Sequence, residues 1–408
     1  MTKQIHSGIA VGQVPEGYKL EHGYVIPKEW KVVHFNECFH RLTQKNTENN
    51  QNVLTISAQQ GLISQLDYYN TLYASEDKTG YFLLQKGDFA YNKSYSADYA
   101  YGAIKQLEKY NKGIVSPLYI CFSANEGTNT DFYRQYFESG MFNREIYKIA
   151  QEGARNHGLL NVSTPEFFSA VLVFPPVEEQ KKIAEVLSCC NRVIELKQQL
   201  IAEMQRLKSG FLQAMFPAKG HSESDIRFPE FSGDWEQRKL GELCNITTGK
   251  LDANAMVSDG QYDFYTSGID VFKIDVAAFE GPAITIAGNG ASVGYMHLAD
   301  GKFNAYQRTY VLTDFLADRQ FLNVAIGNEL PDKIQEEVRG SGIPYIVLNM
   351  LTDLAIPFPS HEEQYAIGVY FQQLDKLITL HQRELEETKK KKKSLAKLLL
   401  TGSVRVPT

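Results

Sequence analysis

The chain has 408 residues, a net charge of −6, and a composition of 43% hydrophobic and 22% charged residues. This length suits two globular units with connecting segments, and no apolar run approaches the roughly 18–20 residues that a membrane span requires. The negative charge argues against a uniformly basic protein that coats nucleic acid without regard to sequence, although it is compatible with a local basic groove.

The cysteines and the N-terminal residues indicate the protein's cellular location and whether it is held together by metals or disulfides. None of the five cysteines forms a C-x-x-C pair, so the sequence predicts neither a zinc site nor a disulfide framework. The first residues lack the continuous apolar core of a secretory signal. We therefore expect a cytoplasmic protein that makes no membrane contact and holds no metal.

Residues 1–173 are predicted to form a first mixed domain, with an arm over 1–29. Strand-like runs dominate from Trp30, and Gly, Asn and Asp residues separate them. A helical pattern near 130–150 interrupts the strands, with apolar residues at helical spacing. This domain is predicted to be α/β and richer in strand than in helix.

A long helix is predicted over 174–216, followed by a polar linker over 217–234. The helix opens with Phe-Pro-Pro-Val-Glu-Glu-Gln at 174–180, where the prolines pre-set a helix start and the glutamates complement the helix dipole. A second β-rich domain is predicted over 235–357. Its opening residues Trp235, Leu240 and Glu242 echo Trp30, Phe35 and Glu37.

The helix opening occurs a second time, at 358–364, as Phe-Pro-Ser-His-Glu-Glu-Gln, and it begins a second long helix predicted over 358–402. The offset between the copies is 184 positions (358 − 174). Ser360 to Glu363 also match a capping box. The helices align without a gap, while the domains before them scarcely match, which is expected if the helices form a frame and the domains vary.

Both helices carry apolar residues at alternating steps of four and three, a coiled-coil period. Polar residues interrupt the seam at matching steps, Lys197 with His381 and Lys208 with Lys392. The matching predicts that the helices pair with each other, antiparallel or symmetrically, or that they face equivalent partners. A second stripe on the first helix, at Val186, Val193, Leu200, Leu207 and Ala214, predicts burial on two sides.

No catalytic constellation is found in the sequence. A P-loop is absent, the Gly-rich stretch 288–294 is better explained as a hairpin around Asn289-Gly290 than as a nucleotide cradle, and the histidines have no metal-binding spacing. Glu178 and Glu179 sit in a helix's first turn, so dipole complementation is their expected role.

Polar and aromatic residues nevertheless suit contact with DNA. The stretch 90–102 interleaves tyrosines with Lys, Asn and Ser, and such side chains contact phosphates and base edges, although cross-strand packing explains the tyrosines equally well. The predicted DNA-binding residues are Asn92, Lys93, Tyr95, Lys105, Arg134, Arg155 and Asn156 in the first domain, and Lys250, Asn289, Ser292, Lys302, Arg308 and Arg339 in the second. The lysine run 389–393 is better explained as a solvated face of the helix than as a phosphate contact.

Two divergent domains are each followed by an F-P-x-x-E-E-Q helix. The second half opens with Trp235-Glu236-Gln237-Arg238-Lys239-Leu240-Gly241-Glu242-Leu243. With these features, the sequence resembles the specificity subunit of a type I restriction-modification system. The resemblance covers nearly the whole chain. It implies two target-recognition domains separated by two long helices that form an antiparallel coiled coil, with a pseudo-twofold internal repeat.

The same resemblance implies a non-catalytic role, in which each domain reads one half of a bipartite site on double-stranded DNA. The implied partners are two adenine-N6 methyltransferase subunits that use S-adenosylmethionine, and motor-nuclease subunits that use ATP and Mg. This chain itself is expected to bind no cofactor. The helices would set the spacer and dock the methyltransferases, and Glu178, Glu179, Gln180, Glu362, Glu363 and Gln364 are the predicted docking residues. At 1.5 Å per residue, about 40 residues make a rod of roughly 60 Å.

Two other classes of protein stay open. A coiled-coil adaptor would show no salt-sensitive, sequence-dependent affinity for DNA, and a standalone DNA-modifying enzyme would itself bind S-adenosylmethionine.

Overall fold

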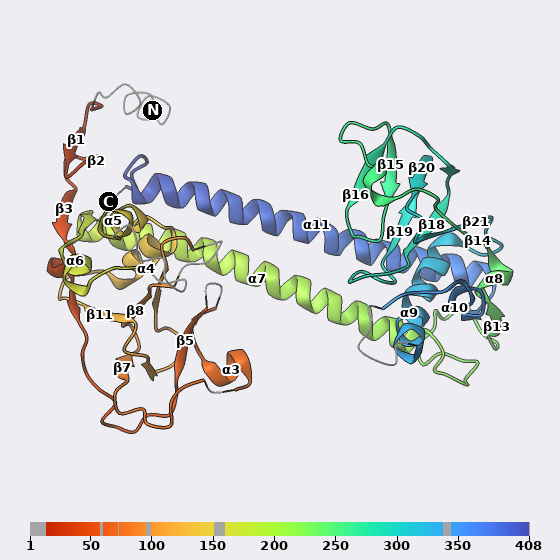
Figure 1. Ribbon diagram of the computed structural model, residues 1–408, viewed down its shortest axis with the longest axis horizontal. Coiled ribbons are helices and arrows are strands. Elements are labelled where there is room, and N and C mark those ends of the chain that lie inside the picture. Colours follow the sequence, from red (N-terminus) through yellow and green to blue (C-terminus); the bar gives the residue numbers. More distant parts are fainter. Residues whose placement is uncertain are drawn as a thin grey trace. The chain divides into compact units, whose positions relative to one another are not determined.

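The computed structural model describes residues 14–57, 60–71, 73–94, 99–150, 160–337 and 344–407. The chain divides into two compact units (Figure 1). Unit 1 comprises residues 1–196 and 385–408, and unit 2 comprises 197–384. Among the described residues, no helix is both long enough and apolar enough to cross a membrane.

Unit 1 is a mixed α/β domain with parts of two long helices. Its elements are β1 (Tyr18–Glu21), β2 (Tyr24–Pro27), β3 (Lys31–His34), α2 (Phe35–Cys38), β4 (Phe39–Arg41), β5 (Leu54–Ser57), β6 (Gly61–Ser64), α3 (Gln65–Tyr69), β7 (Phe82–Gln85), β8 (Phe89–Asn92), β9 (Ala103–Gln106), β10 (Lys112–Val115), β11 (Ile120–Ala124), α4 (Thr130–Glu138), α5 (Asn143–Ile149), α6 (Thr164–Ser169), β12 (Val171–Phe174) and the first half of α7 (Val177–Met215).

Unit 2 is likewise mixed α/β. It contains β13 (Glu236–Lys239), α8 (Leu240–Leu243), β14 (Asn245–Thr248), the 3-10 turn η1 (Ala253–Ala255), β15 (Tyr262–Tyr265), β16 (Val271–Ile274), β17 (Phe279–Glu280), β18 (Ala283–Ala287), β19 (Met296–Ala299), β20 (Lys302–Ala305), β21 (Thr309–Thr313), α9 (Arg319–Glu337), α10 (Leu348–Thr352), β22 (Ala355–Phe358) and the first half of α11 (His361–Leu400).

The central sheets of the two units have the same strand order. Unit 1 has β4-β11-β8-β9 and unit 2 has β14-β21-β18-β19, with antiparallel neighbours throughout. In each unit, a strand near the start of the mixed domain also pairs antiparallel with a strand just before a long helix. These pairs are β3 with β12 in unit 1 and β13 with β22 in unit 2. The sequences of the domains therefore diverge much further than their topology does.

The remaining sheets differ between the units. Unit 1 has three two-stranded pairs, β1-β2, β5-β6 and β10-β7, whereas unit 2 has a second four-stranded sheet, β16-β15-β20-β17, in which β15 and β20 run parallel.

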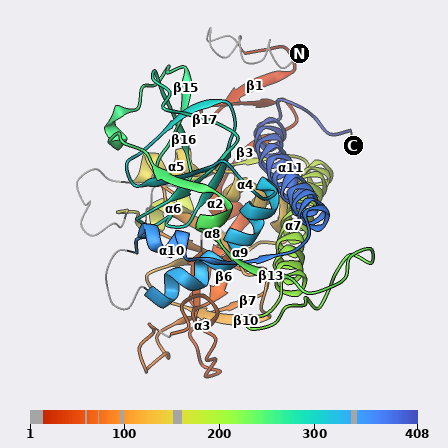
Figure 2. The same ribbon diagram turned by 90° about the vertical axis from the view of Figure 1, so that its right-hand side faces the viewer.

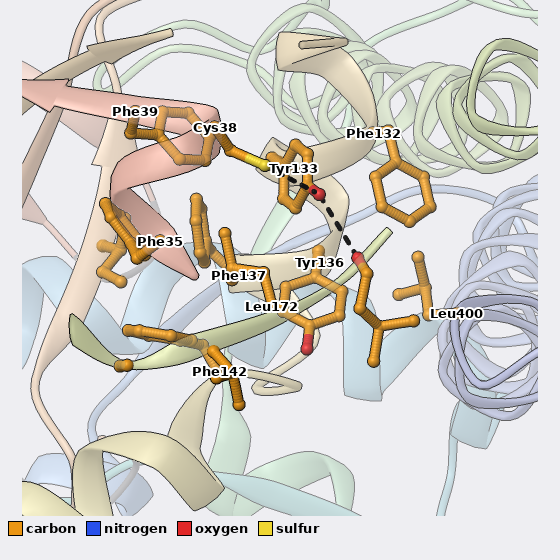
Figure 3. Close-up of a cluster of buried hydrophobic side chains, with 14 of the residues drawn as sticks. Phe35, Cys38, Phe39, Phe132, Tyr133, Tyr136, Phe137, Phe142, Leu172 and Leu400 are labelled. Atoms are coloured by element: carbon orange, nitrogen blue, oxygen red, sulfur yellow. Dashed lines mark hydrogen bonds between the residues drawn. The ribbon is translucent and has the colours of Figure 1, made fainter. Parts of the chain in front are cut away.

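The core of unit 1 is rich in aromatic rings from α2, β4 and α4, and Leu172 of β12 lies among them (Figure 3). Phe35 and Tyr133 are both fully buried, and the Tyr133 hydroxyl donates to the carbonyl oxygen of Val173 over 3.2 Å. Ile183 of α7 and Leu399 of α11 belong to the same cluster. The start of one long helix and the end of the other therefore share a single core.

Within each unit, α7 and α11 lie side by side and antiparallel (Figures 1 and 2). In unit 2, Lys197 pairs with Glu384 over 2.8 Å and Lys208 pairs with Asp375 over 2.6 Å, so residue numbers fall along α11 as they rise along α7. The seam positions named in the sequence analysis are buried or half-buried in both helices. Of the second predicted stripe, however, Val193, Leu200 and Leu207 are 40–48% exposed, so the expectation of burial on both sides was wrong for them.

Local signals explain where several elements begin and end. Asn129 caps α4 by accepting from the backbone N–H of Phe132 over 2.8 Å. Gly140, at a φ of +72°, separates α4 from α5, so the single helical pattern near 130–150 is two helices. Ser360 accepts from the Glu363 backbone N–H over 3.3 Å, which is half of the predicted capping box.

Candidate nucleic-acid interface

One end of the central sheet in unit 2 gathers several loops. The stretch 288–294 joins β18 to β19 as an antiparallel hairpin, as the sequence predicted. The N–H of Gly288 donates to the Arg308 carbonyl over 2.9 Å, the N–H of Gln307 donates to the Leu251 carbonyl over 2.8 Å, and the N–H of Ile346 donates to the Gly288 carbonyl over 2.8 Å. The loops around 250, 290, 307 and 345 therefore form one edge.

Two glycines allow these loops to approach each other closely. A Cβ on Gly249 would lie 1.9 Å from the carbonyl oxygen of Ala305, and one on Gly288 would lie 2.4 Å from that of Arg308. No side chain fits at either position without moving the backbone.

The predicted residues Lys250, Asn289, Ser292 and Arg308 all lie on this edge. Lys250 and Arg308 are exposed, and the Asn289 side-chain oxygen accepts from the Ser267 hydroxyl over 2.7 Å, which orients the amide. Lysine and arginine neutralise phosphates, and arginine, asparagine and serine also read base edges. The edge can therefore both hold a DNA backbone and contact bases.

Two other predicted residues of the second domain do not join this edge. Lys302 begins β20 and so lies at the strand's opposite end from Tyr306 to Arg308. Arg339 is outside the described residues.

His297, on β19, was missed by sequence reasoning. Its ring centroid lies 4.9 Å from that of Tyr295 and 5.1 Å from that of Tyr265, and its Nε2 is buried with no partner in the described part of the chain. Burial lowers the pKa of His297, which favours a neutral ring that donates at one nitrogen and accepts at the other. A histidine two residues after the exposed Tyr295 was the available signal.

In unit 1 the described parts of the tyrosine-rich stretch, 90–94 and 99–102, lie at the equivalent place, where β8 ends and before β9 begins. Asn92 and Lys93 are half-buried at the end of β8. Tyr91 is buried, stacks on Phe167 with centroids 5.2 Å apart, and donates its hydroxyl to the Tyr101 carbonyl over 2.9 Å. For Tyr91, packing is therefore the observed role. Tyr95, Arg155 and Asn156 lie outside the described residues.

Lys105 and Arg134 are not placed as a DNA surface would need. The Lys105 side chain is 9% exposed, with its ammonium 3.7 Å from Glu138. The Arg134 side chain is 14% exposed, and its guanidinium lies 3.3 Å from Glu108 and 3.6 Å from Asp131. Either cation would have to break its ion pairs to reach a phosphate, so neither Lys105 nor Arg134 lies on a freely exposed basic surface in this structure.

The predicted docking residues also prove to be mostly internal. Glu179, Gln180, Glu363 and Gln364 are at most 2% exposed, and only Glu178 and Glu362 face solvent. Gln180 donates to the Pro175 carbonyl over 2.8 Å, and Gln364 donates to the Pro359 carbonyl over 2.9 Å, so both glutamines fasten the start of their helix. The four buried side chains are not available to a partner in this conformation.

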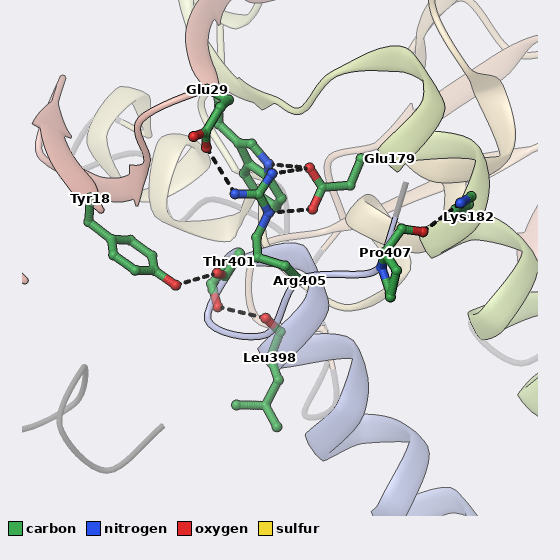
Figure 4. A network of polar contacts seen from close by, with 10 residues as sticks. Tyr18, Glu29, Glu179, Lys182, Leu398, Thr401, Arg405 and Pro407 are labelled. Atoms are coloured by element: carbon green, nitrogen blue, oxygen red, sulfur yellow. Dashed lines mark hydrogen bonds and ion pairs between the residues drawn. The ribbon is translucent and has the colours of Figure 1, made fainter. Parts of the chain in front are cut away.

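Each buried glutamate is held by an arginine. Arg405 binds both carboxylate oxygens of Glu179, which also accepts the Trp30 indole N–H (Figure 4). In the other unit Arg227 binds both oxygens of Glu363. Neither arginine was among the predicted site residues, although the repeated Arg-x-Pro at 227–229 and 405–407 was a signal. Among the described residues, no group of three or more His, Cys, Asp or Glu side chains is placed to hold a metal.

Residues 232–390 match the family model of the type I restriction modification DNA specificity domain. The chain is 40% identical over 166 residues to the type I restriction enzyme EcoDI specificity subunit of Escherichia coli, a match that covers 41% of this chain and 35% of that protein, so the matched segment spans about a third of that relative. It is 24% identical over an alignment of 431 residues to the type I restriction enzyme MjaVIII specificity subunit of Methanocaldococcus jannaschii, with 96% of each chain covered.

Solved structures share the fold. The crystal structure of the S subunit of a type I restriction-modification system from M. genitalium has a TM-score of 0.58 at 16% identity, covering 93% of this chain and 97% of that one. A structure from a study of complex assembly and conformational transition in the type I system has a TM-score of 0.56 at 17% identity, covering 93% of this chain and all of the other. Residues 232–390 therefore match a type I restriction modification DNA specificity domain, and the chain as a whole shares the fold of type I S subunits.

Proposed function

We propose that this chain is the non-catalytic subunit that reads a bipartite DNA site for a type I complex, with one half-site read by each domain. The equivalent hairpins β8–β9 and β18–β19 carry this proposal, because each presents polar side chains at the same end of a sheet with the same strand order. The residues proposed to face DNA are Asn92 and Lys93 in the first domain and Lys250, Asn289, Ser292 and Arg308 in the second. Tyr95, Arg155, Asn156 and Arg339 remain predictions.

The partners follow from the same role. Two adenine-N6 methyltransferase subunits that use S-adenosylmethionine, and motor-nuclease subunits that use ATP and Mg, would supply the chemistry. Methylation of a base within a duplex requires its extrusion, and this chain would position the duplex for that step.

The proposed docking surface for the methyltransferases is the exposed apolar face of the long helices. Val193, Leu196, Leu200 and Leu207 on α7, and Leu377 and Leu380 on α11, are 40–49% exposed. Leu196 and Leu380 are equivalent at the 184-residue offset. Repeated exposed leucines on a helix mark an interaction surface, and the equivalence supports two copies of one partner. Leu200→Glu should abolish co-purification of one methyltransferase, whereas Gln199→Glu, at the neighbouring exposed position, should not.

We further propose that α7 and α11 form the antiparallel coiled coil of a pseudo-twofold frame and set the spacer between half-sites. Inserting or deleting four residues within 195–205 should then change the spacer length and leave the bases of both half-sites unchanged. New half-site bases in such a variant would contradict this assignment.

Co-expression with a candidate methyltransferase subunit, followed by methylation-sensitive sequencing, tests the function as a whole. A bipartite methylated motif that depends on this chain is the expected result. Assembly without any such motif would favour the adaptor, and S-adenosylmethionine binding by the purified chain alone would favour the standalone enzyme.

A further inference from the structure

An Arg-x-Pro segment follows each long helix, and its arginine binds a buried glutamate at the start of the other helix. Arg227-Phe228-Pro229 follows α7, and Arg405-Val406-Pro407 follows α11. Arg227 binds Glu363, near the start of α11, and Arg405 binds Glu179, near the start of α7. The same contact is therefore made once in each unit.

In unit 1, Arg405 connects three separate segments (Figure 4). Its Nε donates to Glu179 Oε1 over 2.6 Å and its Nη2 donates to Glu179 Oε2 over 2.8 Å, while Nη1 donates to Glu29 Oε2 over 2.9 Å. Glu179 also accepts from Trp30 Nε1 over 2.8 Å. The tail after α11, the start of α7 and the opening of the first domain therefore meet at one carboxylate.

In unit 2, Arg227 makes the corresponding connection. Its Nε and Nη2 each donate to Glu363 over 2.7 Å. The same guanidinium donates to the carbonyl of Gly233 over 2.5 Å and to that of Ser232 over 3.3 Å. These carbonyls lie two and three residues before Trp235, where the second domain opens. The linker, the start of α11 and the opening of the second domain are thus joined.

We propose that Arg405 and Arg227 are positioning residues, each of which orients one target-recognition domain on the helices, so that each is required for reading one half of the DNA site. The inference rests on the proposed function. A planar guanidinium that binds both oxygens of a carboxylate fixes the angle between them as well as the distance. A glutamate that is at most 1% exposed needs these donors, because a buried charge without partners is strongly disfavoured.

The first test uses Arg405→Lys and Arg227→Lys, which keep the positive charge but lose the bidentate hydrogen bonds to the carboxylate. Each variant is co-expressed with the methyltransferase subunit, and the methylated motif is sequenced. Arg405→Lys should relax the base requirement in one half-site only, with methylation of wild-type sites reduced at least tenfold, and Arg227→Lys should relax the opposite half. The proposal would be overturned if either variant relaxed the base requirement in both half-sites. It would also be overturned if neither variant relaxed the base requirement in any half-site.

The second test needs no DNA and follows hydrogen exchange in the purified chain. Arg405→Lys should raise exchange at least tenfold in β3 and β12 and leave β13 and β22 unchanged, and Arg227→Lys should do the reverse. Exchange that rises equally in both units, or in neither, would contradict the positioning role. If the wild-type complex yields no bipartite motif, the proposed function fails, and the exchange pattern still decides whether the arginines hold the domains.

Controls separate this role from general loss of surface contacts. Lys182 donates to the Pro407 carbonyl of the same tail, and Lys219 pairs with Glu336 at an exposed surface of unit 2. Lys182→Gln and Lys219→Gln should leave both the motif and the exchange pattern as in the wild type. A domain-selective change in either control would show that any contact has this effect, and would overturn the assignment to the two arginines.

Discussion

The indole nitrogen of Trp30 donates a hydrogen bond of 2.8 Å to Glu179, whereas that of Trp235, the equivalent residue of the second domain, is buried and finds no partner among the described residues. Both rings are at most 4% exposed. The first domain thus adds a third donor to its buried carboxylate, and the second domain leaves a buried N–H unpaired, which is a cost to folding.

This difference predicts that Trp30→Phe lowers the free energy of unfolding by about 1–3 kcal/mol more than Trp235→Phe, because only the first substitution removes a donor from a charged, buried acceptor. Both substitutions remove similar ring volume, so each serves as the control of the other. Chemical denaturation of the two variants measures the difference. Equal losses would mean that the hydrogen bond to Glu179 contributes nothing net.

The sequence predicted the helices well and the polar contacts poorly. The F-P-x-x-E-E-Q repeat and the four–three seam depend on local spacing, and the helices occur at Val177–Met215 and His361–Leu400. Glu178 is exposed, whereas Glu179 is buried, because Glu179 is bound by Arg405, which comes from a segment 226 residues away. No local pattern around Glu179 contains that partner.

Two glycines of the long helices should respond in opposite ways to alanine. A Cβ on Gly210, in the exposed interior of α7, would meet nothing within 4 Å, whereas one on Gly368 would lie 2.8 Å from the Phe321 backbone nitrogen. Gly210→Ala should raise the free energy of unfolding by about 0.5–1 kcal/mol, the difference in helix propensity. Gly368→Ala should lower it by about 1–3 kcal/mol through overpacking. Thermal or denaturant unfolding distinguishes them, and stabilisation by Gly368→Ala would mean that α9 moves freely away from α11.

Arg308 and Lys302 provide a test of the interface in the second domain. Both are exposed, but the Arg308 backbone is hydrogen-bonded to Gly288 at the loop edge, whereas Lys302 lies at the other end of β20. If Arg308 reads a base, Arg308→Ala should weaken binding of the assembled complex to its methylated motif by about 1–3 kcal/mol. If Arg308 holds a phosphate, the substitution should instead reduce the slope of the logarithm of the binding constant against the logarithm of the salt concentration by about one. Lys302→Ala should change neither. Binding titrations at several salt concentrations measure both quantities, and a larger effect at Lys302 would place the interface elsewhere.

Residue type alone could not separate surface cations from internal ones in the first domain. Lys105 and Arg134 are as basic as Lys250 and Arg308, and they meet their carboxylate partners, Glu138 and Glu108, only because α4 packs against β9, an arrangement that no local pattern predicts. The topology had to be known before burial could be assigned. The candidate edge of the second domain was more predictable, because Asn289-Gly290 carries its own turn signal.

Lys392, one of the matching polar steps of the predicted seam, should make stability depend on pH. Burial lowers its pKa, and Arg134 and Lys105 lower it further while Glu138 acts in the opposite sense. Because the folded-state pKa is below that of the unfolded chain, the folded state bears the cost of the buried charge wherever Lys392 is protonated. The folded state releases its proton first as pH rises, so this cost disappears between the folded-state pKa and the unfolded value of about 10.4.

Lys392→Met should therefore raise the free energy of unfolding at pH 7 by about 1 kcal/mol, a usual size for a single substitution, and its advantage over the wild type should shrink as the pH approaches about 10. Lys391→Met is the matched control, because the neighbouring Lys391 side chain is 80% exposed and lies 3.7 Å from Glu387. Denaturant unfolding from pH 6 to 10 measures both variants. An advantage of Lys392→Met that stays constant across this range would show that the gain comes from packing of the methionine and not from removal of a buried charge.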